Sequence, residues 1–94
     1  MMDTREALVK RLEDVCYNET TITMEMEMKM NPDLGVGMSL DVVLRDVSND
    51  ENMIYIDIDE GSFTIDATNV EHDENVDYYE CYGNDANIIF GFMF

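Results

Sequence analysis

Apolar and polar residues alternate strictly over residues 22–30. The even positions from Ile22 to Met30 are apolar, and the odd positions between them carry Thr, Glu or Lys. A β-strand points successive side chains to opposite faces of its sheet, whereas a helix would spread these residues around its circumference. The alternation therefore predicts a half-buried antiparallel strand with a methionine-rich face toward the core and a charged face toward solvent.

The N-terminal segment has the spacing of a helix. Apolar residues recur at intervals of three or four positions at Leu8, Leu12 and Val15, which places them on one helical stripe. Asp3 precedes this stripe and Glu6 follows three residues later, a variant of the capping box that begins many helices. We expect a helix over about residues 3–17.

Further alternating segments predict the rest of a sheet. We expect strands over about residues 36–46, 54–58, 63–68, 76–82 and 86–94, the last apolar on both faces as in a central or doubly covered strand. Turns are expected near residues 31–35, 59–62 and 83–85, and polar loops near 48–52 and 69–75. The sequence thus predicts a single α+β domain over residues 1–94, with an N-terminal helix packed on one face of a five- or six-stranded antiparallel meander sheet.

If a helix covers the apolar face of this sheet, the opposite face stays exposed to solvent. Tyr55 would lie within it, among the acids at alternate strand positions: Glu25, Glu27, Asp41, Asp57, Asp59 and Asp66.

Length and composition favour a folded, soluble domain. The chain has 94 residues, of which 46% are hydrophobic, so that a core can form without metal or disulfide crosslinks. It contains no uncharged apolar run long enough to span a membrane and does not begin with a signal peptide, so we expect a cytoplasmic protein. Cys16 and Cys81 fall in different predicted elements and are expected to be free thiols.

The chain has a strongly negative net charge. Five basic residues stand against 22 acidic ones, a net charge of −17, and no Lys or Arg follows Arg45. A field of one sign bears on solubility and partners rather than on fold.

Motifs for catalysis or metal binding are absent from the sequence. The segment from Asp57 to Gly61 superficially resembles a calcium loop, but Gly61 stands where an EF-hand has a ligand and strands flank it. His72 is expected to be a solvated loop residue, because no Ser or Cys pairs with it by motif. We therefore expect no enzyme activity, no metal and no cofactor.

Methionines and tyrosines each have two interpretations. Most of the nine methionines lie at inward strand positions, which favours core filling over an adaptable binding surface. Tyr78, Tyr79 and Tyr82 could anchor an interface or line the core, and the sequence leaves both open.

Three interpretations apply to the acidic residues: general solubility, adaptation to high salt, and mimicry of duplex DNA. Adaptation to salt is disfavoured because Ala occurs only three times whereas Ile, Met and Asn are frequent. Double-stranded DNA carries about one charge per 1.7 Å of axis. A domain about 30 Å across would match it with roughly 18 charges, close to the net charge of this chain.

In this general character the chain resembles the acidic DNA-mimic inhibitors of phages and mobile elements, which include anti-CRISPR and anti-restriction proteins and uracil-DNA glycosylase inhibitors. The resemblance implies a monomeric inhibitor in the cytoplasm of a bacterial host. It would bind the basic DNA-binding surface of a CRISPR-Cas effector or another nuclease, and neither nucleic acid nor membrane directly. Those families share no fold, so the resemblance assigns no residue.

From charge alone, the expected partner-binding residues are those that crowd the half of the chain without basic residues. First come four on the third and fourth predicted strands: Asp57, Asp59, Glu60 and Asp66. The neighbouring loops add six more: Asp50, Glu51, Glu71, Asp73, Glu74 and Asp77. The alternative is a small acidic adaptor subunit anchored by the tyrosines and the C-terminal strand, whose binding would depend little on salt.

Overall fold

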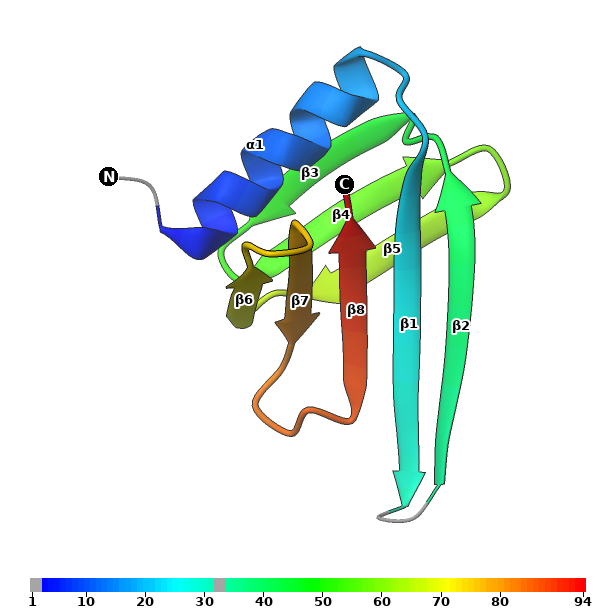
Figure 1. Ribbon diagram of the computed structural model, residues 1–94, viewed down its shortest axis with the longest axis vertical. Coiled ribbons are helices and arrows are strands. Elements are labelled where there is room, and N and C mark those ends of the chain that lie inside the picture. Colours follow the sequence, from blue (N-terminus) through cyan, green and yellow to red (C-terminus); the bar gives the residue numbers. More distant parts are fainter. Residues whose placement is uncertain (1–2, 32–33) are drawn as a thin grey trace.

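The computed structural model describes residues 3–31 and 34–94, with side chains for residues 3–28 and 37–94 (Figure 1). It confirms an α+β fold with an N-terminal helix and antiparallel strands, which form two sheets rather than a single meander. The turn expected near residues 31–35 includes Pro32 and Asp33, which lie outside the described residues.

Helix α1 (Thr4–Tyr17) begins as the sequence predicts. Asp3 is its N-cap and accepts a hydrogen bond from the Glu6 backbone N–H at 2.8 Å, which satisfies one of the amides left unpaired in the first turn. Leu8, Val9 and Leu12 are buried. Within the described residues, no helix has both the length and the apolar character needed to cross a membrane.

The larger sheet has five strands in the order β2-β1-β8-β7-β6. They are β1 (Ile22–Asn31), β2 (Leu34–Val42), β6 (Asn69–Asp73), β7 (Tyr78–Tyr82) and β8 (Ile88–Met93). The apolar C-terminal segment left open whether its strand is central or doubly covered; β8 is central, and it pairs antiparallel with β1 on one side and β7 on the other.

The smaller sheet has three strands, β3 (Asp46–Asp50), β4 (Met53–Ile58) and β5 (Gly61–Asp66). It lies behind the larger sheet in Figure 1, with its strands crossing those of the larger sheet, while α1 runs beside β3. Contacts of α1 with β3 and β6 place the helix along an edge strand of each sheet.

One core lies between the two sheets and the helix. Ile54, Ile56 and Ile65 of the smaller sheet are fully buried, as are Phe92 and Cys81 of the larger. Phe63 on β5 meets Phe90 on β8 edge to face, with 6.4 Å between ring centroids, a favoured geometry for aromatic pairs. The methionine face of β1 is thus covered at Met24 and Met26.

Three sequence predictions are wrong in detail. The strand expected over 36–46 ends at Val42, and the chain crosses to the other sheet through buried Leu44. The segments expected as loops at 48–52 and 69–75 contain β3 and β6. Both are edge strands that bury little apolar surface, so their alternation is too weak to distinguish them from loops.

Candidate functional site

The outer face of the five-stranded sheet collects carboxylates from four of its strands. Because strand side chains alternate between faces, residues next to the buried Met24, Tyr79 and Cys81 point away from the core. We call this surface the acidic face, and its carboxylates are Glu25, Glu27, Asp41, Glu71, Asp73 and Glu80.

Strand register aligns several of these residues in a row across the sheet. Glu25 on β1 lies opposite Gly91 on β8, Gly91 lies opposite Glu80 on β7, and Glu80 lies opposite Glu71 on β6. Directly opposed side chains in an antiparallel pair lie about 5 Å apart at Cβ, where like charges destabilise a sheet. The acidic face therefore contains an unfavourable charge pair, Glu71 with Glu80.

Tyr78 lies across the middle of this face. Its hydroxyl donates to Glu25 Oε2 at 3.1 Å, and its ring passes over Gly91, where a Cβ atom would collide with it. Burial, the hydrogen bond to Glu25 and the surrounding carboxylates raise the pKa of Tyr78 well above its usual range. Tyr78 thus stays protonated and holds Glu25 in place.

Tyr82 is the second tyrosine of the acidic face. Burial and the negative charge of the neighbouring Glu71 raise the pKa of its phenol. Both tyrosines are half-buried. They therefore combine apolar surface with polar groups among the carboxylates, a combination common at protein interfaces.

A hollow of about 450 Å³ opens on this face beside Tyr78. Glu25, Glu27 and Ser39 line it together with Ile89, and its floor includes Gly37, which has no side chain. Two carboxylates beside apolar side chains form a chemical environment suited to the stem and charged head of a Lys or Arg side chain.

The residues predicted from charge do not share one surface. Glu71 and Asp73 lie on the acidic face, whereas Asp50, Asp57 and Asp66 lie on the outer face of the three-stranded sheet with Tyr55. The others lie in turns: Glu51, Asp59, Glu60, Glu74 and Asp77. The expectation of one acidic surface that joins Glu25 to Asp57 is wrong, because these residues belong to two sheets whose outer faces point in opposite directions.

Arginines neutralise part of the charge elsewhere. The Arg45 guanidinium makes two hydrogen bonds to the Asp59 carboxylate, at 2.8 and 3.0 Å, and lies 3.6 Å from Glu19. These bonds hold the pKa of Asp59 below its usual range. Among the described side chains, by contrast, no Lys or Arg lies on the acidic face.

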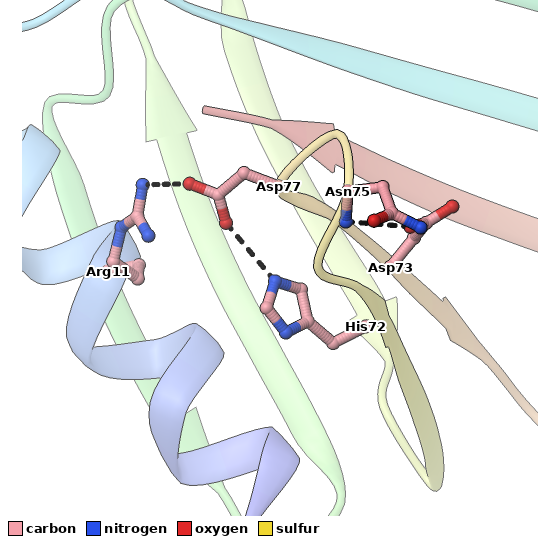
Figure 2. Close-up of polar contacts among 5 residues, drawn as sticks. All are labelled: Arg11, His72, Asp73, Asn75 and Asp77. Atoms are coloured by element: carbon pink, nitrogen blue, oxygen red, sulfur yellow. Dashed lines mark hydrogen bonds and ion pairs between the residues drawn. The ribbon is translucent and has the colours of Figure 1, made fainter.

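Asp77 is a structural residue rather than a free surface acid (Figure 2). Its carboxylate binds Arg11 of α1 at 2.7 Å and His72 at 3.1 Å. The hydrogen bond from Arg11 is the main reason that the pKa of Asp77 is lowered. His72 lies on β6, not in a loop, and stacks on Tyr79 at a centroid distance of 4.0 Å. Together these contacts join the helix to the edge of the larger sheet.

The alternation of residues 76–82 did not place Glu80, Tyr78 and Tyr82 on the acidic face. Tyrosine can lie on either face of a strand, so residues 76–82 left the inward face undecided. The apolar residue opposite each position settles it: Tyr79 lies opposite Phe92, and Cys81 lies opposite Phe90. Phe90 and Phe92 of β8 identify the inward residues of β7 only if the pairing of β7 with β8 is already known.

Other candidate chemistry is limited. Both cysteines are free thiols, as predicted, and burial raises the pKa of Cys81 to about 12. Within residues 3–31 and 34–94, no group of three or more His, Cys, Asp or Glu side chains is placed to hold a metal ion.

Comparison with known proteins identifies no relative. A scan against protein-family models, a search of curated proteins and a search of solved structures each found no match to this chain.

Proposed function

We propose that the protein is a non-enzymatic inhibitor that binds the basic, DNA-contacting surface of another protein through its acidic face. The partner class that fits is a nuclease, of which a CRISPR-Cas effector is one kind. Binding would occlude the groove that DNA otherwise enters. The protein would act as a monomer and would not contact nucleic acid itself.

The spacing of carboxylates on the acidic face carries this proposal. Five strands about 4.8 Å apart span about 19 Å across the sheet. A DNA duplex of that length carries about 11 charges, of which about half point to any one side. The six carboxylates of the acidic face thus offer a basic groove a charge density similar to one side of a duplex.

The tyrosines favour the same surface. The adaptor alternative uses the tyrosines and the C-terminal strand as anchors, but Tyr78 and Tyr82 lie among the carboxylates, and the Tyr78 hydroxyl is hydrogen bonded to Glu25. The C-terminal strand buries Phe90 and Phe92 in the core, and its exposed apolar side chains, Ile88 and Met93, lie at its two ends. A single surface can then provide both the charge and the aromatic contacts.

The test compares two charge reversals of equal size on opposite faces. Glu27→Lys with Glu80→Lys alters the acidic face, and Asp46→Lys with Asp50→Lys alters the exposed edge strand β3. Each immobilised protein captures partners from lysate of the native host. Bound protein is then released by a salt gradient or by added duplex DNA.

We expect the wild-type protein and the β3 variant to retain a nucleic-acid-binding protein that salt releases and duplex DNA displaces. The acidic-face variant should lose it, because counterion release makes such binding steeply dependent on charge. The proposal would be contradicted by a partner that stays bound at high salt and is not displaced by DNA. Equal loss of partner binding in both variants would also contradict it.

A further inference from the structure

Strand β2 is an uncovered edge of the five-stranded sheet. Among the described residues it pairs with β1 alone in the sheet order, and all five residues 37–41 are exposed. Figure 1 shows the β1–β2 hairpin extending beyond the three-stranded sheet. An edge strand presents unpaired N–H and C=O groups that can bind another strand. The sequence of β2 contains no Lys, Arg or Pro, the residues that usually protect such an edge.

The inner side of this edge is apolar. Met38 and Leu40 of β2 are 48% and 37% exposed, although they alternate on the same face as the buried Val42. Met28 on β1 and Ile88 on β8 lie opposite each other and are 38% and 44% exposed. The three-stranded sheet does not cover these side chains fully, and they form an apolar strip that runs from the β2 edge toward β8.

The outer side of the same edge is acidic. Asp41 is exposed on β2, and Gly37 lies directly opposite Glu27 on β1. Because Gly37 has no side chain, no β2 side chain stands between the edge and Glu27, and the small Ser39, opposite Glu25, is the outward side chain of β2 that lines the hollow. A strand added next to β2 would lie about 10 Å from β1, a gap that a long basic side chain and the Glu27 side chain can span together.

We propose that β2 binds an extended segment of the partner as an added strand in which apolar and basic residues alternate. The apolar residues would cover Met38 and Leu40. The basic residues would point to the other face, one of them passing over Gly37 into the hollow between Glu25 and Glu27. Main-chain hydrogen bonds would supply affinity, and the alternation would supply specificity.

Charge favours such a segment over a second copy of this chain. Each copy carries a net charge of −17, and pairing β2 with itself would place Asp41, Glu25 and Glu27 of two chains on one continuous sheet face. A basic segment gains from the same carboxylates. The basic character of the segment rests on the proposed function, whereas the strand pairing at β2 can be tested separately.

A short peptide of alternating valine and arginine residues serves as the probe. Its control has the same composition with the valines and arginines in separate blocks, which preserves charge but not alternation. Binding to the full-length, ¹⁵N-labelled protein is followed by amide chemical shifts and by hydrogen exchange. We expect amides of β2 around Ser39 to become protected with the alternating peptide only.

Two variants locate the site. Met38→Lys places a repelling charge on the apolar strip and should weaken binding of the alternating peptide about tenfold or more. Val76→Lys introduces the same charge at an exposed apolar residue in the turn between β6 and β7 and should have little effect. The fold of each variant is checked from its amide spectrum.

Three results would overturn the inference. Equal binding of the block peptide without protection of β2 would mean that charge alone drives association, and the proposed function would survive. A dimer in sedimentation experiments that Met38→Lys dissociates would assign β2 to self-association. Loss of binding in the Glu27→Lys, Glu80→Lys variant with no effect of Met38→Lys would place the partner on the acidic face but away from the edge.

Discussion

The Tyr78 hydroxyl on β7 donates to Glu25 Oε2 on β1 at 3.1 Å, across the strand that separates them. The intervening residue is Gly91 of β8, and the absence of a side chain there leaves the space that the Tyr78 ring occupies. One glycine therefore orders a tyrosine and a carboxylate on the face proposed to bind a partner.

Substitution of Gly91 by alanine should displace the Tyr78 ring. The added Cβ would occupy space that the ring fills, so the ring must move and the hydrogen bond to Glu25 is lost. Overpacking of this kind destabilises proteins by about 1–3 kcal/mol. Gly37→Ala is the matched control because nothing lies within 4 Å of its added Cβ. Urea unfolding should separate the two variants, and equal stability would contradict this account of Gly91.

Ionisation of Tyr78 should lower stability at alkaline pH. Burial and Glu25 raise its pKa in the folded protein above the ordinary value of 10.0. The unfolded chain therefore loses this proton first, and stability falls as pH rises above about 10. Tyr78→Phe removes the group and should flatten this part of the stability curve, measured by urea unfolding from pH 8 to 11. A fall as steep as in the wild-type protein would show that Tyr78 is not responsible.

The sequence predicts best where one apolar face is long and regular. Strand β1 and helix α1 follow their alternation and capping residues closely, because every second or every third to fourth side chain meets the core. The break after Val42 is hidden because Val42 and Leu44 keep the alternation of a single strand while the chain changes sheet.

The candidate site could be predicted only in part. Glu25, Glu27 and Asp41 were placed on an outer face from alternation alone, and they lie there. Which other acids join them depends on strand order, and local sequence does not encode that β8 lies between β1 and β7. Asp57 was therefore grouped with a face that it does not share.

Asp77 should stabilise the contact between helix and sheet in a pH-dependent way. The Arg11 hydrogen bond lowers the pKa of Asp77 from the usual 3.8, so its contribution is present above that pH and is lost as pH falls below it. Asp77→Asn should cost about 0.5–1 kcal/mol at neutral pH and much less near pH 2. Asn is a suitable replacement because residue 77 has a φ of 49°, a conformation that Asn tolerates.

Glu74→Gln is the control for Asp77→Asn, since it removes the same charge from an exposed position in the same turn. Stability is measured by urea unfolding across acidic pH. If both variants lose the same stability at neutral pH, the ion pair with Arg11 contributes nothing specific to the docking of α1.

Charge reversal at Glu80 should raise stability and weaken partner binding. It lies directly opposite Glu71 in the β6–β7 pair, and opposed like charges destabilise a sheet. Glu80→Lys replaces this repulsion with attraction and should raise stability by about 0.2–1 kcal/mol at low salt.

Glu74→Lys makes the same change in net charge without a directly opposed acid in the strand register, and a smaller gain there would isolate the cross-strand pair. The gain from Glu80→Lys should shrink with added salt, because salt screens exposed charges. If the acidic face binds a basic partner, this more stable variant binds it less well than the wild-type protein. If Glu80→Lys is no more stable than Glu74→Lys, the opposed carboxylates do not repel each other measurably. The charge of the acidic face would then not lower the stability of the fold.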